Sequence, residues 1–212
     1  MFASFQSIQL VLNDVTLLGD LTHSPHATGV GVFSHSSGNS RLSPRNRAVV
    51  QLLQAAGLTT ILFDLLSPAE NQTYATRFDT VLLTRRLLGV AHWMTQQPTL
   101  AGLRLGFFGA STGAASALGA AAELGSTVGA VVSRGGRPDL ALPVLHRVRA
   151  PTLLLVGSND GSVIALNEQA LRVLGPPSEL RIIPGAGHLF EEPGTLEQVA
   201  DATAAWFSRY LS

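Results

Sequence analysis

The feature that most limits the fold of this chain is a series of short apolar stretches that alternate with amphipathic segments of helical period. Most of these stretches are apolar on both of their faces, whereas a strand with one face in water would alternate apolar and polar residues. Strands of this kind are typical of a parallel sheet that helices cover on both sides. The stretches lie at residues 28–34, 58–66, 103–110, 128–133, 150–158 and 179–185.

Helical patterns occupy the intervals between these stretches. The pair Ser43-Pro44 opens a helix that ends at Gly57, because proline suits the first helical position and glycine suits the end of a helix. Thr195 and Gln198 have the spacing of a capping box at the start of the last helix. Further helices are expected at residues 76–97, 112–124, 163–174 and 195–211.

The N-terminal segment follows a different rhythm. Ile8 and Leu10 alternate with polar residues ahead of the turn pair Asn13-Asp14, which predicts an antiparallel hairpin. The longest break between two predicted strands, residues 134–150, is too short to form a lid, so no cap domain is expected. The sequence therefore predicts an α/β fold with a mostly parallel sheet, an N-terminal antiparallel hairpin and helices on both faces.

Length and charge narrow the class of protein. A chain of 212 residues suits one domain, residues 1–212, with a single large core. The formal net charge is zero and the arginines are scattered, which favours a small neutral substrate and predicts no nucleic-acid or membrane partner. The first residues lack the features of a secretory signal, so a cytoplasmic location is expected. Nothing in the sequence points to a homo-oligomer or excludes one.

Two residue types are missing from the chain. It has no cysteine, which excludes disulfides, thiolate nucleophiles and cysteine-bound zinc. All 14 of its basic residues are arginines, which excludes a lysine Schiff base and a P-loop lysine. His23 and His26 are spaced like a metal-binding pair, but no further ligands cluster near them in the sequence, so no metal site is expected there.

Ser111 is the best candidate for a nucleophile. It is the central residue of "GASTG", residues 109–113, which matches G-x-S-x-G and falls where a predicted strand gives way to a helix. In that pattern the serine occupies a strained turn, and the flanking glycines relieve the crowding that side chains would create. The alternative is that Ser111 is one more small residue in a chain rich in them, since the bare pattern is short enough to arise by chance.

A serine nucleophile needs a base and a carboxylate that orients the base. Asp160 follows the next-to-last predicted strand and His188 follows the last one, and the order Ser, Asp, His is typical of this kind of fold. The structural alternative for Asp160 is a helix cap or turn residue, and for His188 a residue of a surface loop. Asp64 also ends a predicted strand and is the rival carboxylate, but it precedes the serine.

Two backbone N–H groups are expected to stabilise a developing oxyanion. One belongs to Thr112, directly after the serine, and the other to Ser37 in the loop that follows the strand at residues 28–34. His35, in the same loop, is interpreted as a structural residue. The candidate walls of the substrate pocket are Tyr74, Phe108, Arg134 and Phe190.

Beyond these motifs, the chain resembles the α/β-hydrolase fold over nearly its whole length, and more narrowly the dienelactone-hydrolase-like serine esterases. The stretches that carry the resemblance are VFSHSSGNSRLSPRNR, LFDLLSP, FFGASTGAA, VVSRGGRPDLA, PTLLLVGSNDGSV and PGAGHLFEEPGTLEQVA. The resemblance implies a triad of Ser111, Asp160 and His188 and ester hydrolysis without a metal or organic cofactor. Dienelactone hydrolases proper use a cysteine in place of Ser111, which favours a general esterase, and Ser36 replaces the usual glycine of the oxyanion loop.

The expected activity is hydrolysis of small or short-chain carboxylic esters through an acyl-enzyme, because no cap domain would enclose the site. An amidase or a thioesterase would use the same triad, so these two activities stay open. A catalytically silent binding protein of the same fold, or a structural subunit, is the alternative from outside enzymology.

Overall fold

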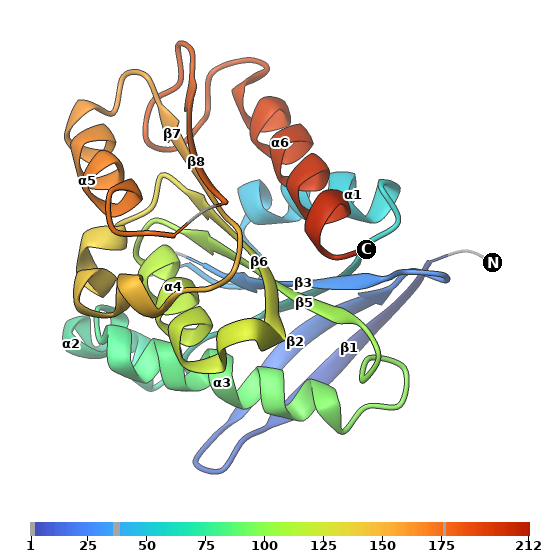
Figure 1. Ribbon diagram of the computed structural model, residues 1–212. Coiled ribbons are helices and arrows are strands. Elements are labelled where there is room, and N and C mark those ends of the chain that lie inside the picture. Colours follow the sequence, from blue (N-terminus) through green and yellow to red (C-terminus); the bar gives the residue numbers. More distant parts are fainter. Residues whose placement is uncertain (1–2, 36–38, 176) are drawn as a thin grey trace.

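The computed structural model describes residues 3–35, 39–175 and 177–212, and its centre is a twisted eight-stranded sheet (Figure 1). The strand order is β1-β2-β4-β3-β5-β6-β7-β8. The first hairpin is antiparallel and β2 also pairs with β4 in antiparallel fashion, whereas every later pairing is parallel. The strands are β1 Ser4–Val11, β2 Thr16–His23, β3 Gly29–Ser34, β4 Thr59–Phe63, β5 Arg104–Ala110, β6 Val128–Arg134, β7 Thr152–Gly157 and β8 Ser178–Ile183.

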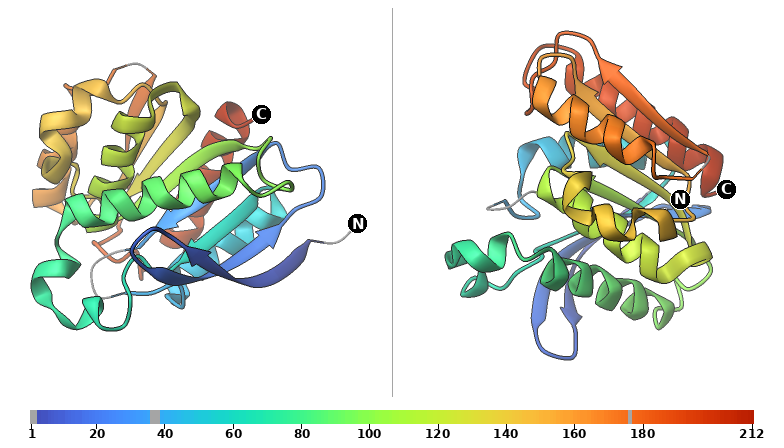
Figure 2. Two further views of the ribbon diagram at one scale, coloured as in Figure 1. Left: turned by 90° about the horizontal axis from the view of Figure 1, so that it is seen from below. Right: turned by 60° about the vertical axis from the view of Figure 1, so that its left-hand side comes forward.

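Helices cover both faces of this sheet, as the apolar strands predicted (Figures 1 and 2). One face carries α3, α4, α5 and the 3-10 segment η3, and the other carries α1 and α6. The α-helices are α1 Pro44–Ala55, α2 Tyr74–Arg77, α3 Thr80–Thr95, α4 Thr112–Leu124, α5 Gly161–Leu171 and α6 Thr195–Tyr210. The 3-10 segments are η1 Glu70–Gln72, η2 Gly125–Thr127 and η3 Pro138–Arg147.

Each face of the sheet has its own core. The first core contains Leu87 of α3 and Leu118 of α4, and both are fully buried. The second contains Phe33 and Phe108 of neighbouring strands, whose rings stack 4.6 Å apart, together with Phe207 of α6. The central strands β3 to β7 are buried on both sides, which is why their sequences carry no polar alternation.

The α/β fold is thus confirmed and the described residues form no cap domain, as expected, while some local predictions were wrong. The capping box is not formed: α6 begins after Gly194, and the Thr195 hydroxyl donates to the carbonyl of Glu192 instead. The helix expected at residues 76–97 is split, because Asp79 caps a new helix by accepting from the N–H of Leu82 at 2.9 Å. In the described part of the chain, no helix has both the length and the apolar character that a membrane crossing demands.

Candidate active site

Three loops at the carboxyl ends of the parallel strands carry the predicted triad. Ser111 follows β5, Asp160 lies three residues after the end of β7, and His188 lies in the loop after β8. Because β5, β6, β7 and β8 are parallel neighbours, their carboxyl ends meet at the same edge. In open parallel sheets this edge is where ligands bind.

Ser111 occupies a strained turn between β5 and α4. Its φ is 51° and its ψ is −119°, a conformation that few residues other than glycine adopt. The turn leaves no room for side chains on either flank: a Cβ at position 109 would lie 2.5 Å from the Cα of Ala114, and one at position 113 would lie 2.3 Å from the carbonyl oxygen of Ser34. The two glycines of the motif are therefore sterically required.

The backbone of the β6 loop holds this turn in place. The N–H of Ser111 donates to the carbonyl of Arg134 at 3.1 Å, and the N–H of Arg137 donates to the carbonyl of Ser111 at 3.0 Å. Both backbone groups of Ser111 are thus fixed from the same neighbouring segment. These hydrogen bonds hold Ser111 in its strained conformation, because a strained backbone persists only where the surrounding structure fixes it.

The three side chains form a continuous chain of contacts. Nδ1 of His188 lies 2.6 Å from Oδ2 of Asp160, and its Nε2 lies 3.3 Å from Oγ of Ser111. With the carboxylate on Nδ1, the tautomer that donates through Nδ1 leaves an Nε2 lone pair facing the hydroxyl. The imidazole is 39% exposed and the carboxylate 13% exposed, so a ligand can reach the histidine while the aspartate is partly shielded.

The loop of His188 is tied to the loop of Asp160. The N–H of Asn159 donates to the carbonyl of Ala186 at 2.9 Å, its side-chain amide donates to the carbonyl of Gly185 at 2.9 Å, and the hydroxyl of Ser158 accepts from the N–H of Gly185 at 2.8 Å. Serine and asparagine are common in turns, so the residue types of Ser158 and Asn159 do not by themselves indicate this role. Their position directly before the candidate aspartate was the one signal that could have indicated this role.

Two further residues of the His188 loop stabilise its shape. Phe190 has a φ of 54° and its ring is 2% exposed in the core of the α1 and α6 face, which anchors the loop. The Glu192 carboxylate accepts hydrogen bonds from its own N–H and from that of Gly187, and these bonds lower its pKa.

The structure describes one of the two residues that were predicted to donate to an oxyanion. Thr112 is the first residue of α4 and is buried, so its backbone lies at a helix N-terminus, where negative charge is favoured. Ser37 lies outside the described residues. Nε2 of His35, two positions before Ser37, accepts from the N–H of Leu65 at 3.1 Å, which agrees with a structural interpretation of this histidine.

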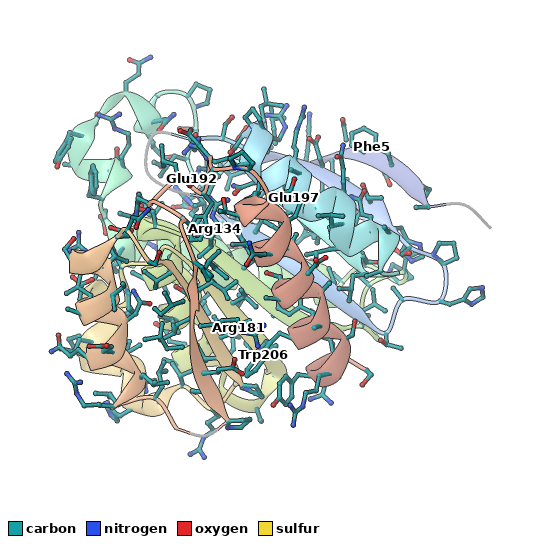
Figure 3. All side chains as sticks on the ribbon, turned by 90° about the horizontal axis from the view of Figure 1, so that it is seen from above. Phe5, Arg134, Arg181, Glu192, Glu197 and Trp206 are labelled. Carbon is teal, nitrogen blue, oxygen red and sulfur yellow. The ribbon has the colours of Figure 1, made fainter. Side chains whose placement is uncertain are left out.

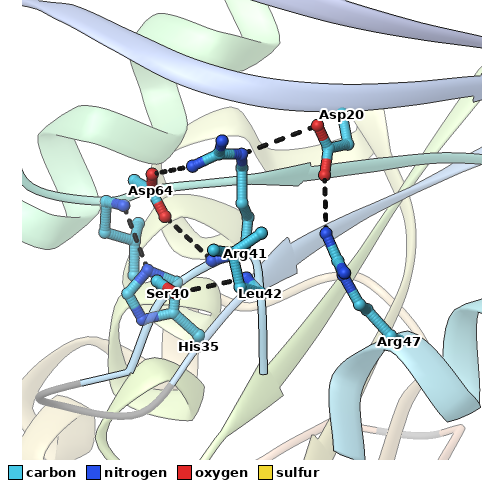
Figure 4. A network of polar contacts seen from close by, with 8 residues as sticks. Asp20, His35, Ser40, Arg41, Leu42, Arg47 and Asp64 are labelled. Atoms are coloured by element: carbon cyan, nitrogen blue, oxygen red, sulfur yellow. Dashed lines mark hydrogen bonds and ion pairs between the residues drawn. The ribbon is translucent and has the colours of Figure 1, made fainter. Parts of the chain in front are cut away.

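Asp64, the rival carboxylate, belongs to a separate polar network (Figure 4). One of its oxygens lies 2.6 Å from Nη1 of Arg41, and the other accepts from the backbone N–H of Arg41 at 2.8 Å. Arg41 also reaches Asp20 of β2, at 3.5 Å. This network fixes the end of the loop after β3, and the carboxylate that contacts His188 is that of Asp160.

The predicted pocket walls need correction. Phe108 is 0% exposed and Phe190 2% exposed, so both rings pack in the core and neither offers a surface to a ligand. Tyr74 is 68% exposed, and its ring packs against that of Phe78 with the centroids 4.5 Å apart. The sequence pattern alone cannot distinguish a residue that lines a pocket from a residue that packs in the core when both lie near the carboxyl ends of the strands.

Arg134 is the fourth predicted wall residue, and its environment is unusual. Its side chain lies on the second core with the guanidinium carbon 5.9 Å from the centre of the Phe108 ring, and the residue is only 8% exposed. Burial, and then the nearby charge of Arg45, lower the pKa of Arg134 to about 10, so it stays a cation at neutral pH. Among the residues that the structure describes, no group of three His, Asp or Glu side chains could hold a metal ion.

Comparison with known proteins places this chain in a family. Residues 47–212 match the family model described as the Dienelactone hydrolase family. The chain belongs to the dienelactone hydrolase family. A crystal structure of a dienelactone hydrolase from Anabaena variabilis ATCC 29413 is similar with a TM-score of 0.98 and 50% identity, over 100% of both chains. These matches to the family and to a half-identical member support a hydrolase activity.

More distant and longer relatives add context to this dienelactone hydrolase family member. The esterase PF2001 of Pyrococcus furiosus shares the fold, with a TM-score of 0.80 and 17% identity over 99% of this chain and 92% of that one. A Mycobacterium tuberculosis protein, provisionally named a phosphoribosyl transferase, is 50% identical over 97% of this chain but only 46% of its own length. The chain thus spans about half the length of the curated relatives it matches.

Proposed function

We propose that this protein is a serine hydrolase that cleaves small or short-chain carboxylic esters through an acyl-enzyme intermediate. The observation that carries the proposal is the contact chain from the Asp160 carboxylate through both nitrogens of His188 to the Ser111 hydroxyl. A serine hydroxyl becomes a useful nucleophile at neutral pH only when a positioned base can take its proton. In the described part of the chain the other candidate carboxylate, Asp64, is paired with Arg41.

The first half of the reaction forms the acyl-enzyme. His188 accepts the proton of Ser111 through Nε2 as Oγ attacks the ester carbonyl, and Asp160 stabilises the imidazolium through Nδ1. The carbonyl oxygen becomes an oxyanion, which the N–H of Thr112 at the start of α4 stabilises together with the N–H of Ser37. The tetrahedral intermediate collapses when His188 returns its proton to the leaving alcohol.

The second half regenerates the serine. Water takes the place of the alcohol, loses a proton to Nε2 of His188 and attacks the acyl carbon. Collapse of the second intermediate breaks the bond to Oγ, releases the carboxylic acid and returns the proton to Ser111. Nε2 and Oγ lie 3.3 Å apart. A contact of this length between a base and a nucleophile can shorten when substrate binds.

The described residues form no cap domain, and the His188 side chain is 39% exposed. The site is therefore open to solvent, which favours small substrates. Short acyl chains suit an open site better than long ones, because a long chain gains binding energy only where a pocket encloses it. Amides and thioesters would use the same groups. Comparison of matched ester, amide and thioester substrates separates the three activities.

The test is hydrolysis of p-nitrophenyl esters of increasing acyl length by the wild type and by Ser111→Ala. We expect turnover of the acetate or butyrate ester, and a loss on the order of a thousandfold or more in the variant. Ser208→Ala, at an exposed position of α6, is the matched control and should keep wild-type turnover. A fluorophosphonate should label Ser111 in the wild type. Retention of most activity by Ser111→Ala would contradict the proposal.

The longer M. tuberculosis relative supplies a second candidate, phosphoribosyl transfer, because it is 50% identical over 97% of this chain. More than half of that protein lies outside the match, so its name can refer to the unmatched part. Incubation of this chain with phosphoribosyl pyrophosphate and purine or pyrimidine bases, followed by assay for pyrophosphate, tests the candidate. Release of pyrophosphate that depends on a base would favour transfer, and its absence beside ester turnover would favour hydrolysis.

A further inference from the structure

The first strand of the sheet has one edge without a strand partner. β1 lies at the end of the strand order, with β2 beside it and α3 over one of its faces. Among the described residues no strand pairs with its outer edge. The backbone N–H and C=O groups along such an edge are free to pair with another extended chain. The outer edge of β1 is therefore a surface that a further strand can occupy.

The hairpin geometry shows which backbone groups of β1 face outward. The N–H of Leu12 donates to the carbonyl of Val15 at 2.9 Å, and the N–H of Asp64 donates to the carbonyl of Leu18 at 2.9 Å. Hydrogen-bonded and non-hydrogen-bonded residue pairs alternate along antiparallel strands. When the register of β1, β2 and β4 is counted from these two bonds, the even-numbered residues of β1 are the ones that bond to β2. The backbone groups that face away from β2 belong to Phe5, Ser7, Gln9 and Val11.

β1 has none of the features that usually prevent an edge strand from pairing. Its sequence, SFQSIQLV, contains no charged residue and no proline, and its register against β2 is regular over all 8 residues. Phe5 is 67% exposed and Val11 68% exposed. Leu18 of β2, which lies opposite Gln9 and so shares the face of these two side chains, is 47% exposed. An uncharged edge flanked by exposed apolar side chains favours association.

The opposite end of the sheet is built differently. β8 carries Glu179 and Arg181, whose side chains form an ion pair at 2.7 Å and are each 44% exposed. Charged side chains on an edge strand discourage a second strand from pairing with it. Figure 3 labels Phe5 of β1 and Arg181 of β8, which belong to the two ends of the sheet. The charged edge is thus β8, and the open, uncharged edge is β1.

The strand that fits this open edge best is β1 of a second copy. In an antiparallel arrangement about a two-fold axis beside Ile8, Phe5 lies opposite the partner subunit's Val11, and Ser7 lies opposite the partner subunit's Gln9. All four outward-facing residues of each copy are then paired. Apolar side chains face apolar ones and polar side chains face polar ones, and cross-strand pairs of this kind stabilise a sheet. A shift of two residues in either direction would pair only three of the four.

We propose that this protein forms a two-fold symmetric dimer through antiparallel pairing of β1, which joins the sheets of two copies into one. The surface lies away from the candidate triad, whose residues follow β5, β7 and β8, so the proposal does not depend on ester hydrolysis. One pair of strands makes a smaller interface than the ~1,600 Å² of a typical stable complex. The dimer is therefore expected to be reversible and to dissociate on dilution.

The first test is the oligomeric state of the wild type. Sedimentation velocity is measured from low micromolar to submillimolar protein concentration. We expect the weight-average mass to rise from that of one chain towards that of two, without larger species, because pairing about a two-fold axis uses up the open edge of both copies. A protein that stays monomeric throughout this range, with β1 left for a strand of another protein, would overturn the proposal.

Charge variants assign the dimer to β1. Ser7→Lys combined with Gln9→Lys places lysines directly opposite each other in the proposed register, which should raise the Kd at least about tenfold. Ser7→Glu combined with Gln9→Glu should act likewise. An equimolar mixture of the two double variants should dimerise again, because each lysine then faces a glutamate. Gln198→Lys combined with Ser208→Lys, the same residue types at exposed positions of α6, is the control and should keep the Kd of the wild type.

These variants separate β1 from any other contact. A dimer whose Kd is unchanged by either pair of charges on β1 would lie on another face and would overturn the proposal. Weakened dimers that mixing does not restore would contradict the antiparallel register. The thermal midpoint of each variant, measured at a concentration at which the wild type is monomeric, verifies that the variant is folded.

Hydrogen exchange of the wild type tests the same contact without a substitution. The N–H groups of Ser7 and Gln9 face outward, so they should exchange readily in the monomer and at least about tenfold more slowly in the dimer. The N–H groups of Gln6 and Ile8 face β2 in the monomer already, so their exchange should change little. Exchange is followed residue by residue by NMR at a low and a high protein concentration. Equal exchange of Ser7 and Gln9 at both concentrations would overturn the proposal, even if the protein dimerises.

Discussion

Nδ1 of His188 and Oδ2 of Asp160 lie 2.6 Å apart, although 28 residues separate them in the chain. Asp160 is the N-cap residue of α5, yet its side chain makes no capping bond to that helix. Aspartate at this position usually accepts from a backbone N–H of the first turn, and replacing such a cap costs about 1 kcal/mol. Here the carboxylate contacts the histidine instead, which favours a role in orienting the base.

Asp160→Asn tests that role. The amide keeps the size of the side chain but can donate to Nδ1, which would place the proton of the imidazole on Nε2 and remove the base that faces Ser111. We expect kcat to fall on the order of a thousandfold or more, with a smaller change in KM. The measurement is p-nitrophenyl acetate hydrolysis between pH 6 and 9. Asp201→Asn, on an exposed position of α6, is the control, and equal activity of the two variants would contradict the role.

Gly113→Ala tests the steric account of the nucleophile turn. The new Cβ would lie 2.3 Å from the carbonyl oxygen of Ser34, a backbone atom that cannot move aside like the end of a side chain. We expect a loss of about 3 kcal/mol or more in the free energy of unfolding, measured in urea, because overpacking against backbone is among the costlier changes. At Gly102 no atom lies within 4 Å of an added Cβ, so Gly102→Ala should leave stability within about 1 kcal/mol of the wild type.

The fold could be predicted because its determinants are local and repeated. Strands such as β7, with all six residues buried, are recognisable from apolar runs alone, and the parallel arrangement follows from the helices between them. Helix ends were harder. α6 begins after Gly194, whose backbone is left-handed, and α3 begins after the capping residue Asp79, and a spacing rule for capping residues anticipates neither start.

The candidate site was predictable where a residue type and a strand end coincide. Ser111, Asp160 and His188 each follow the carboxyl end of a parallel strand by one to five residues, so a single rule finds all three. The pocket walls follow no such rule. Phe108 lies on β5, the strand that leads to Ser111. Whether its ring faces a ligand or the core depends on the packing of α1 and α6, which are distant from it in the sequence.

Asp64→Asn separates a structural from a catalytic role for the rival carboxylate. Asp64 is 22% exposed and contacts Arg41 at 2.6 Å, so the variant leaves a partly buried guanidinium with a weaker partner. We expect the free energy of unfolding to fall by about 1–3 kcal/mol. The pair of Glu179 and Arg181 has 44% exposure on both sides, so Glu179→Gln should cost about 0.5 kcal/mol or less.

Activity provides the second readout for this pair of variants. Because the network of Asp64 fixes the loop after β3 and does not contact His188, Asp64→Asn should keep at least about a tenth of the wild-type kcat. A catalytic Asp64 would instead reduce kcat as severely as Ser111→Ala. That result would exchange the roles assigned to Asp64 and Asp160.

The carboxylate of Glu192 makes the loop of His188 sensitive to acid. Its pKa is lowered in the folded protein by hydrogen bonds from its own N–H and that of Gly187, so the charged form stabilises the fold. A group with a lowered folded pKa contributes stability above its unfolded pKa of about 4.3, and that contribution is lost as the pH falls through the folded value. We therefore expect Glu192→Gln to lower the thermal midpoint slightly at pH 7 and to leave it nearly equal to that of the wild type near pH 3. Asp201→Asn, at an exposed position in the middle of α6, is the control, and a difference between wild type and Glu192→Gln that stays constant from pH 7 to pH 3 would show that the charge of Glu192 has no part in holding the loop.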